Sequence, residues 1–542
     1  MTRNIEKLSK DKFDVLIIGG GIHGASLAWV ASMTGLYTAL IEKKDFAQGA
    51  SSNSQKIIHG GLRYLQQLDL PRIKQSVSER KRLMWLAPHL IHPLECVMPT
   101  YGYGVKGKEA MKIGLTLYDT LSNNRNELPD TSKHIPNCQI LSKNEINQFI
   151  PDVEKTGLRG GALWYDGYCY NTERLVMAFL KSASKNKTIV ANYVNALSIN
   201  SANNVVSGVE ACDEITGEKF LIKTDNIINC TGLSGNDSIS KDHRSKFVKG
   251  VAGINVVVSK LFPKSTAVGL QNRDDESSRL YFVLPWRGKS VLGTEWFPIN
   301  GSGESFKIKE KQIAQLIENF NTTYHSSNLS LDDISFLHQG VVPGNGAYAG
   351  DISTLKKYKI LDESDHGLKG LITVIGIKYT TAVYVAEQVM KKIIPSFRPK
   401  DLFDQPRLIE GEIDNFDNYK SMMIQNWQKY FESDDIGRIV FNYGSQAEHL
   451  FNKSISPENE GKNNYKVNLI EQEVLNAIEN EMAIKLSDTI LRRTEIGTTE
   501  IPAMSNIDFI SKIMAKKLSW DEDKRCNEIE ELKKFYPKFD IN

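Results

Sequence analysis

A short apolar run followed by a glycine-rich turn, near the start of the chain, constrains the fold more than any other feature. The run over 13–18 is typical of a buried parallel strand. The turn after it has the pattern G-x-G-x-x-G, made by Gly19, Gly21 and Gly24. In such a turn the first glycine permits a tight bend, the second lets the backbone approach a pyrophosphate, and the third lets a helix pack against the strand. The stretch therefore predicts the start of a βαβ unit.

The residues after the turn complete this unit. A helix is predicted over about 25–34, with its N-terminus directed at phosphates, where free N–H groups and the helix dipole favour negative charge. Gly35 is predicted as its C-cap, and a second strand over 37–41 ends at Glu42. An acid at this distance binds the ribose hydroxyls of an adenosine and argues against NADP. We therefore predict a dinucleotide site, with a glycine turn in an ordinary α/β sheet as the alternative.

A loop rich in serine and glycine follows over 49–64. Small hydroxylated residues beside glycines supply many hydroxyl and backbone donors in little space. Such a loop suits a phosphate or flavin environment. A plain polar surface loop is the alternative.

Length and composition are those of an ordinary globular protein. The chain has 542 residues, 41% hydrophobic and 24% charged, which is enough for about two to four domains. The net charge of +2 gives no sign of nucleic-acid binding, and the six cysteines lack paired metal-ligand spacing, as expected of reduced intracellular thiols. Residues 1–12 predict a mobile lead-in without a signal peptide, and no apolar run approaches the roughly 18 residues that span a bilayer. We expect a cytoplasmic protein, and peripheral contact with the inner face of the membrane is compatible with these features.

Later regions predict an inserted sheet domain and a helical domain. The runs over 253–259 and 279–293 alternate as in an antiparallel sheet. A buried strand over 371–375 then enters a glycine turn and a helix, which offers another helix N-terminus to an anion or a flavin carbonyl. From about 399 the chain is mostly helical, and apolar residues at every fourth position over 470–490 predict the core of that domain.

Several longer motifs carry a specific resemblance. They are GGGIHG (19–24), SSNSQKIIHGGLRYL (51–65), APHL (87–90), DGYCYNTERL (166–175), RLYFVLPW (279–286), GTE (293–295), GIKYTT (376–381), NYGS (442–445) and ENEMAIKLSDTILRRT (479–494). Over most of its length the chain resembles the FAD-dependent glycerol-3-phosphate dehydrogenases, a branch of the D-amino-acid-oxidase-like flavoproteins. The KIIHGGLRYL string is far more specific than the glycine turn.

The resemblance implies a fold of the α/β plus α+β class. An FAD-binding, Rossmann-like parallel-sheet domain would carry an inserted antiparallel-sheet substrate domain and be followed by a C-terminal α-helical domain. We expect the following boundaries: 13–398 for the oxidoreductase region, with FAD-binding segments at about 13–90, 155–250 and 340–398 and substrate-domain segments at about 91–154 and 251–339, and 399–542 for the helical domain.

The resemblance also implies FAD bound in an extended form, with its pyrophosphate at the glycine turn and its ribose at Glu42. Val194 would touch the adenine side, Thr231 and Gly232 the phosphate side, and Lys378 the polar edge of the flavin. The cofactor residues that it implies are Gly19, Gly21, Ile22, His23, Gly24, Glu42, Lys43, Ser51, Ser52, Lys56, His59, Gly60, Gly61, Leu62, Val194, Thr231, Gly232, Lys378, Tyr379 and Thr380.

The family moves a hydride from a secondary alcohol carbon to flavin N5, and the electrons pass to a membrane quinone or to oxygen. Such a reaction needs the carbon over N5, a base for the hydroxyl proton and stabilisation of the arriving charge. A lone histidine is more often structural, so the catalytic role of His59 depends on the motif. For Glu295 a structural role is as well supported as a catalytic one. The catalytic candidates are His59, Arg63, Tyr64, Glu295 and Lys378.

Three positions in the expected substrate site depart from the family. Val342 replaces an arginine that grips the substrate phosphate in G-V-R-P, and losing a bidentate charged contact costs several kcal/mol. Asn255 replaces a histidine in G-[VI]-H-[IL]-V and cannot accept a proton at neutral pH. A second arginine aligns with Lys356, which keeps the charge but not the fork geometry.

We therefore expect FAD to bind, while the substrate has alternatives. The first is glycerol-3-phosphate, oxidised to dihydroxyacetone phosphate. The others are the same hydride step on another polyol, sugar or hydroxy compound, the oxidation of an amine, and a flavin-binding protein without turnover. Lys356, Lys378 and Arg63 would hold an anion in a different pose. A quinone or oxygen is the expected electron acceptor, and a homodimer is compatible with the sequence.

Overall fold

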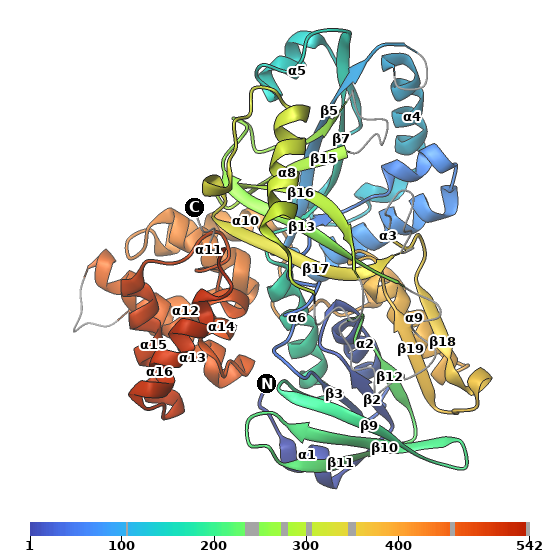
Figure 1. Cartoon of the computed structure of the whole chain (residues 1–542), viewed down its shortest axis with the longest axis vertical. Coiled ribbons are helices and arrows are strands. Elements are labelled where there is room, and N and C mark those ends of the chain that lie inside the picture. The colour runs from blue at the N-terminus through green and yellow to red at the C-terminus, as the bar shows by residue number, and fades with distance from the viewer. Residues whose placement is uncertain are drawn as a thin grey trace.

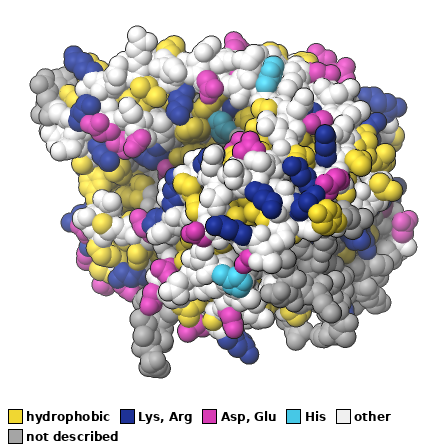
Figure 2. Space-filling model, turned by 90° about the horizontal axis from the view of Figure 1, so that it is seen from above, with side chains coloured by type: hydrophobic (Ala, Val, Ile, Leu, Met, Phe, Trp, Pro, Cys, Tyr) yellow, Lys and Arg dark blue, Asp and Glu magenta, His cyan; other side chains and the backbone are white. Residues whose placement is uncertain are grey.

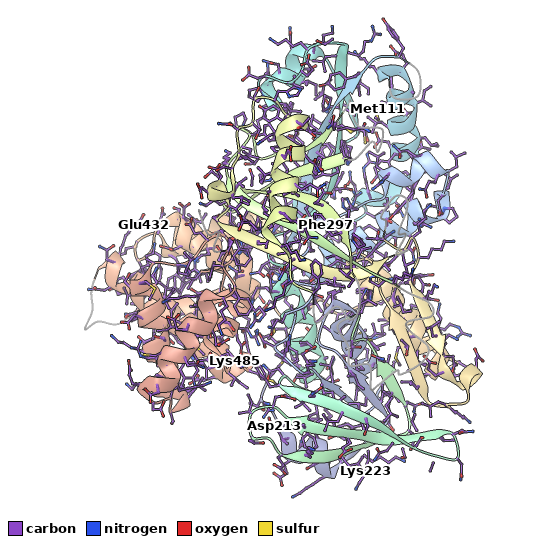
Figure 3. All side chains as sticks on the ribbon, viewed as in Figure 1. Met111, Asp213, Lys223, Phe297, Glu432 and Lys485 are labelled. Atoms are coloured by element: carbon purple, nitrogen blue, oxygen red, sulfur yellow. The ribbon has the colours of Figure 1, made fainter. Side chains whose placement is uncertain are left out.

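The computed structural model of the chain (Figure 1) describes residues 1–103, 107–233, 249–272, 280–299, 306–344, 354–455 and 461–537. The strands in these ranges form a six-stranded, a four-stranded and a nine-stranded sheet. Helices from the last part of the chain gather on one side of the molecule (Figure 1). Figure 3 places Asp213 and Lys223 on the four-stranded sheet at one end, Phe297 in the largest sheet, and Glu432 and Lys485 in the helical region. The predicted fold class is confirmed.

The six-stranded sheet contains the predicted βαβ unit. Its order is β18-β19-β12-β2-β3-β8, and all neighbours are parallel except β18 and β19. The carboxyl ends of parallel strands meet at one edge, which is where ligands bind in such sheets. Its strands are β2 (Val15–Ile18), β3 (Thr38–Ile41), β8 (Ile189–Ala191), β12 (Ile227–Asn229), β18 (Lys359–Asp362) and β19 (Leu371–Ile375).

Alternate residues of these strands face two different layers. Val15 and Ile17 pack with helices on one face, whereas Leu16 and Ile18 pack with the four-stranded sheet on the other. Burial on both faces explains the unbroken apolar run in the sequence. The helices are α2 (Ile22–Ser32), α6 (Thr172–Lys185) and α9 (Ala382–Ile393), and the four-stranded sheet contains β1 (Lys12–Phe13), β9 (Val194–Ala202), β10 (Val205–Asp213) and β11 (Lys219–Thr224).

Helix α2 begins earlier than predicted. Gly21 is its N-cap, so the first turn of the helix starts inside the glycine motif, and Met33 rather than Gly35 is its C-cap. Almost every residue of α2 is buried, because α6 and α9 both pack against it. Because α2 starts directly after β2, the N–H groups of its first turn lie at the carboxyl edge of the sheet.

The expectation of a mobile lead-in over 1–12 is wrong. This segment contains α1 (Ile5–Lys10), and Arg3 donates to the carboxylate of Asp213 at 3.0 Å. The N-terminal ammonium of Met1 donates to the carbonyl of Asn480 at 2.9 Å. The first residues thus join the four-stranded sheet to the helical region.

The nine-stranded sheet is built from strands between residues 57 and 344, which alternate along the chain with strands of the other two sheets. Helices α5 (Lys143–Phe149) and α8 (Glu310–Thr323) cover one face, and the other face packs partly against the helical region. Helices α3 (Leu70–Leu86) and α4 (Lys108–Leu121) lie beside it. The strand order is β17 (Phe336–Gly344), β13 (Lys249–Ser259), β16 (Lys289–Pro298), β15 (Leu280–Trp286), β14 (Ala267–Gln271), β5 (Ile91–Tyr101), β7 (Leu158–Cys169) and β4 (Ile57–Ile58), with β6 (Gln139–Leu141) paired to β7.

The apolar stripe predicted over 470–490 lies in the core, but not on one helix. Helix α13 ends at Glu481, Met482 adopts a left-handed conformation, and a short helix and a π-helical turn follow. Val474 and Ile490 nevertheless share one buried cluster, so the core prediction is confirmed. The helices are α10 (Phe416–Trp427), α11 (Ser433–Tyr443), α12 (Ala447–Ser454), α13 (Lys462–Glu481), α14 (Leu486–Asp488), the π-helical turn (Thr489–Arg493), α15 (Met504–Leu518) and α16 (Glu522–Lys533).

Three negative findings apply to the described part of the chain. No helix there is both long and apolar enough to cross a membrane. No group of three or more His, Cys, Asp or Glu side chains there could hold a metal ion. All six cysteines are free, as predicted. On the face that Figure 2 shows, basic and acidic side chains are interspersed.

Candidate functional site

A cavity of about 2260 Å³ opens where the carboxyl edge of the six-stranded sheet meets one face of the nine-stranded sheet. Sites for small ligands usually occupy about 300–1,000 Å³, so this one has room for an extended dinucleotide and a substrate. The glycine turn, the loop after Glu42 and the segment 376–380 line one part of it. Strands β13, β15, β16 and β17 line another.

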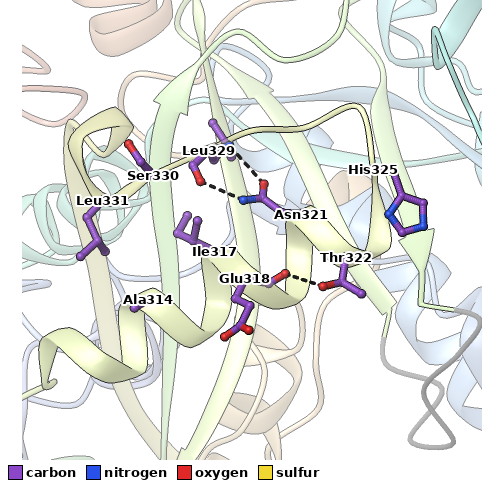
Figure 4. Close-up of a pocket in the computed structure, with 9 residues that line it drawn as sticks. All are labelled: Ala314, Ile317, Glu318, Asn321, Thr322, His325, Leu329, Ser330 and Leu331. Atoms are coloured by element: carbon purple, nitrogen blue, oxygen red, sulfur yellow. Dashed lines mark hydrogen bonds between the residues drawn. The ribbon is translucent and has the colours of Figure 1, made fainter.

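A smaller hollow of about 640 Å³ lies on α8 (Figure 4). There the side chain of Asn321 donates to the carbonyl of Leu329 at 2.8 Å and accepts from its N–H at 3.1 Å. The hydroxyl of Thr322 donates to the carbonyl of Glu318 at 2.9 Å. These polar groups bond to α8 and the turn after it, so they are already used within the helix and its turn. We therefore take the larger cavity as the candidate site.

Two glycines of the turn are required by close approach. Gly19 has φ +111°, and a Cβ on it would lie 2.8 Å from the carbonyl of Cys230 at the end of β12. A Cβ on Gly24 would lie 1.9 Å from the carbonyl oxygen of Gly19. Side chains at either position would push β2, β12 and α2 apart.

Glu42 closes the turn from the end of β3. Its carboxylate accepts from the N–H of Gly20 at 2.7 Å and from the N–H of Lys44 at 2.9 Å. Burial raises its pKa, although both N–H groups act in the opposite direction. Glu42 lines the cavity beside Val194, where the ribose prediction requires an acceptor.

The loop after Glu42 folds back over the N-terminus of α2. Ser51 accepts from the N–H of Ile22 at 2.9 Å through its hydroxyl, and the N–H of Ala47 donates to the carbonyl of Gly20 at 3.0 Å. Loop and turn thus form one bonded unit, and a serine hydroxyl stands at the first turn of the helix.

The second strand–turn–helix unit meets the first. A Cβ on Gly376 would lie 2.1 Å from the imidazole of His23, so the two turns are in contact. Burial lowers the pKa of His23 to about 4, which keeps this ring neutral. The hydroxyl of Tyr379 donates to the carbonyl of Thr172 at 2.6 Å and fixes the turn to α6.

Most of the predicted cofactor residues line the cavity: Gly19, Gly21, Ile22, His23, Glu42, Lys43, Ser51, Ser52, His59, Gly61, Leu62, Val194, Thr231, Gly232, Lys378, Tyr379 and Thr380. Gly24, Lys56 and Gly60 do not. Gly24 is a packing position, as above, and a Cβ on Gly60 would lie 2.1 Å from the hydroxyl of Tyr118 and 2.3 Å from Arg80.

Lys56 lies beneath the cavity wall. Its side chain is fully buried and donates to the carbonyl of Ser52 at 2.5 Å and the hydroxyl of Thr172 at 2.8 Å, and it lies 3.4 Å from Glu173. Burial lowers its pKa, and Glu173 opposes that shift. Lys56 thus does not line the cavity, and it ties the serine-rich loop to α6.

His59 lines the cavity, and its ring contacts the carboxylate of Asp166. Its Nδ1 lies 3.1 Å from Oδ2 of Asp166, while its side chain remains 54% exposed. Burial alone would raise the pKa of Asp166, but His59, Arg80 and the N–H of Gly60 lower it. Asp166 is therefore an anion that fixes the imidazole and leaves Nε2 for another partner.

Two predicted residues, Tyr64 and Lys378, come together with an arginine that we did not single out. The Nζ of Lys378 lies 4.2 Å from the centroid of the Tyr64 ring, and Cζ of Arg72 lies 4.8 Å from it. Burial and the charge of Arg72 lower the pKa of Lys378 to about 8. Arg72 is paired with Asp69 at 2.9 Å, and with Lys378 and the exposed Arg63 the cations still outnumber that carboxylate on this wall of the cavity.

One cross-strand row forms the wall on the nine-stranded sheet. Asn255 is paired with His338 on β17 and with Gly293 on β16, and Gly293 is paired with Phe282 on β15. All four residues line the cavity. Asn255 accepts from the hydroxyl of Thr294 at 2.7 Å, and a Cβ on Gly293 would lie 2.2 Å from its amide oxygen.

The remaining predicted residues divide between cavity and core. Val342 lines the cavity, and so does the exposed Lys356. Glu295 does not; it is 1% exposed and accepts from the hydroxyl of Tyr281 at 2.7 Å. Of its two alternatives, this position favours the structural one.

Several residues of the cavity were missed, namely Gln55, Arg72, Asp166, Phe282, His338 and Arg492. Asp166 is the first residue of the motif DGYCYNTERL, and its place in that motif was the available sequence signal. Its contact with His59 is seen only in the structure. No sequence pattern pointed to His338, because its place opposite Asn255 depends on the register of two distant strands.

The residues present fit an extended FAD. The turn has no side chains at Gly19 and Gly21, a helix N-terminus follows it, and a partly buried carboxylate stands at the end of β3. The cavity extends from Val194, beside the carboxylate of Glu42, to Lys378, so one of its ends is anionic and the other is cationic. These features match the adenosine, pyrophosphate and ring of such a cofactor.

Comparison with known proteins decides the family. Residues 14–389, more than half of the chain, match the family described as FAD dependent oxidoreductase. The chain belongs to this family. Residues 409–525 of this FAD-dependent oxidoreductase match the C-terminal domain of alpha-glycerophosphate oxidase. FAD is therefore its cofactor, as predicted.

Relatives of this oxidoreductase cover almost its whole length. A glycerol-3-phosphate dehydrogenase of Synechocystis sp. is 30% identical over 557 aligned residues, which cover 98% of both chains. An aerobic glycerol-3-phosphate dehydrogenase of Staphylococcus epidermidis is 29% identical and covers 98% of this chain and 95% of its own. The structure of a glycerol-3-phosphate dehydrogenase from Bacillus halodurans complexed with FAD has a TM-score of 0.77 at 23% identity, covering 99% and 98%. The family resemblance of the motifs is thus confirmed, and the last comparison confirms the fold.

Proposed function

We propose that this FAD-dependent oxidoreductase oxidises the secondary alcohol of glycerol-3-phosphate to the ketone of dihydroxyacetone phosphate. The observation that carries the proposal is the sharing of one cavity by the glycine turn, the His59–Asp166 pair and a group of cations around Tyr64. The similarity of the whole chain to glycerol-3-phosphate dehydrogenases supports the choice of substrate.

His59 is the proton acceptor in this proposal. Asp166 holds Nδ1, so the imidazole presents Nε2 to the hydroxyl, and the carboxylate stabilises the imidazolium that results. Bound FAD supplies the hydride acceptor at its N5. The neighbouring Phe282, whose ring centroid lies 6.4 Å from that of His59, limits access of water from the side of the sheet.

Lys378, Arg72 and Arg63 bind the phosphate of the substrate. An arginine at 342 would hold it from β17, whereas these cations come from other segments, around Tyr64 and the 376–380 turn. Ammonium and guanidinium groups in a partly buried site bind phosphate through charge-assisted hydrogen bonds. The substrate would therefore lie in a different orientation from that of relatives with the arginine.

Electrons leave the reduced enzyme to a quinone or to oxygen. This choice of acceptor follows from the family resemblance. On the same ground we propose a cytoplasmic location, peripheral attachment to the inner face of the membrane and association as a homodimer. Preparing membranes at low and high salt and following the protein by blotting tests attachment, and sedimentation of the purified holoprotein tests the dimer.

A second candidate is the same hydride step on a polyol, sugar or other hydroxy compound without a phosphate. Val342 favours it, because an apolar side chain at that position of the cavity wall provides no partner for an anion. An amine substrate has no particular residue in its favour.

Anaerobic bleaching of the flavin absorbance separates these candidates. Glycerol-3-phosphate should bleach the purified holoprotein faster than glycerol, sugar alcohols or amines at equal concentration. Bleaching by an uncharged polyol alone would replace the first candidate with the second. Failure of every compound in the panel would count against both.

A further inference from the structure

Asp45, in the loop after β3, connects the cofactor site to the C-terminal helical region. Its carboxylate is fully buried and accepts from Nε of Arg492 at 2.6 Å and from both terminal nitrogens of Arg493, at 2.8 and 2.6 Å. Both arginines belong to the π-helical turn that replaces the predicted continuous helix. Asp45 does not line the cavity, so the ligand cannot be its partner.

The loop held by Asp45 also closes the cofactor end of the cavity. Glu42 precedes Asp45 and binds the N–H of Gly20. Ala47 follows it and binds the carbonyl of Gly20, and Ser51 binds the N–H of Ile22. Three bonds on both sides of Asp45 thus join the loop to the glycine turn, and a shift of Asp45 would be transmitted to all of them.

Residues 482–492 of the helical region also hold the segment before Val194. Asn192 donates to Asp45 at 2.9 Å and to the carbonyl of Met482 at 2.9 Å. The hydroxyl of Tyr193 donates to Asp488 at 2.7 Å, and Arg492 donates to the same carboxylate at 2.7 Å. Val194, the next residue, lines the cavity. The loop around Asp45 and the segment before Val194 are therefore both attached to residues 482–493.

The charges of this cluster balance within a buried site. Two carboxylates, Asp45 and Asp488, face two guanidinium groups, Arg492 and Arg493. Although burial opposes ionisation of Asp45, the two arginines hold its pKa well below the usual range. Buried ion pairs of this kind add little net stability, because desolvation offsets their attraction, but bidentate geometry fixes position. The cluster is thus suited to setting the position of the loop.

We propose that Arg493 is a positioning residue for FAD and that Arg492, which also lines the cavity, holds the same loop, so that the cofactor is retained only while the C-terminal helical region is docked on the loop around Asp45. Coupling between two sites is reciprocal, so bound FAD also stabilises the docked position of residues 482–493. The inference concerns the cofactor and not the alcohol, and it therefore stands apart from the proposed substrate.

The test is the affinity of the full-length chain, stripped of flavin, for added FAD. Titration with FAD, followed by flavin fluorescence and absorbance, gives Kd for Asp45→Asn and Arg493→Met. Both variants should raise Kd roughly tenfold or more, the usual size of such coupling. The matched control is Arg438→Met, which removes a bidentate pair with Glu473, at 2.8 and 2.6 Å, inside the helical region.

The control separates positioning from general destabilisation. Arg438→Met should lower the melting temperature but leave the Kd for FAD within about twofold, because neither Arg438 nor Glu473 lines the cavity or bonds to Asp45. If all three variants change Kd equally, or none does, the proposal is overturned.

A milder variant covers the case in which Arg493→Met does not fold. Arg492→Gln leaves both bonds of Arg493 to Asp45 in place. In the flavin-free chain this variant should speed hydrogen exchange at 42–52, and in the wild type FAD should slow exchange at 482–493. Unchanged exchange at both segments would overturn the proposal.

Discussion

The cofactor end and the substrate end of the cavity are built in different ways. At the cofactor end, backbone groups and side chains close together in the sequence, from Gly19 to Ser51, form a single bonded unit. At the substrate end, Tyr64, Asn255 and Lys378 come from segments far apart in the chain. A site made by backbone geometry tolerates few changes. A site assembled from separate side chains can change its ligand while the fold stays the same.

The largest effect is expected from adding one carbon atom at the cofactor end. In Gly24→Ala the new Cβ would meet the carbonyl oxygen of Gly19 at 1.9 Å, and neither backbone can move without separating α2 from β2. Overpacking of this kind costs about 1–3 kcal/mol and should leave most of the purified protein without flavin. The measurement is the ratio of flavin to protein absorbance, together with the melting temperature.

Gly437→Ala is the matched control, since Gly437 also lies in a helix but its Cβ would meet nothing within 4 Å. An alanine in a helix interior should raise stability by about 1 kcal/mol and leave flavin content unchanged. Full flavin content in Gly24→Ala would show that the turn is less constrained than its geometry indicates.

This contrast explains what could be predicted from the sequence. The glycine turn, the strand before it and Glu42 were found because local spacing determines their geometry. The end of α13 was missed, since a regular apolar repeat over 470–490 gives no sign that Met482 turns left-handed. The ordered N-terminus was also missed, because its partners Asp213 and Asn480 are remote in sequence.

The next effect concerns chemistry without loss of cofactor. Asn at position 59 can accept a hydrogen bond but cannot take a proton, so His59→Asn should slow anaerobic flavin reduction by about 10²–10⁴-fold. Flavin content should stay normal, because His59 is half-exposed and its partner Asp166 retains Arg80 and the N–H of Gly60. Stopped-flow absorbance at several pH values measures the rate. A rate within a few-fold of the wild type would assign the proton to another group, with His338 the first to examine.

The substrate end was predictable only in part. Tyr64 and Lys378 were identified by motif, and the structure brings them together. Lys56 belongs to the same motif as Tyr64, over 51–65. It nevertheless lies under the loop, because its partners Thr172 and Glu173 are buried on α6. Arg72 lies outside every motif that carries the family resemblance. Which side of α3 faces the cavity depends on tertiary packing rather than on the helix pattern.

A smaller effect should appear in the pH dependence of substrate affinity. Lys378 has its pKa lowered to about 8, so it is charged below that pH and neutral above it. An anionic substrate binds the charged form, and kcat/KM should therefore fall as pH rises through about 8, by up to about tenfold per unit for one proton. In Lys378→Arg the side chain remains charged, so this limb should disappear. If the limb persists in that variant, another group causes it.

The smallest effect, in the opposite direction, is expected from Val342→Arg. The new guanidinium would enter the cavity from β17, where the family resemblance implies an arginine that grips the phosphate, and would add a charged contact to that phosphate. One such contact contributes about 1.5 kcal/mol or more, so KM for glycerol-3-phosphate should fall about tenfold. Val342→Met, which adds length without charge, should leave KM unchanged. Steady-state kinetics with glycerol-3-phosphate and with glycerol would separate the two outcomes: an improvement confined to the phosphorylated alcohol indicates that Val342 weakens phosphate binding, and an equal change for both indicates altered cavity shape.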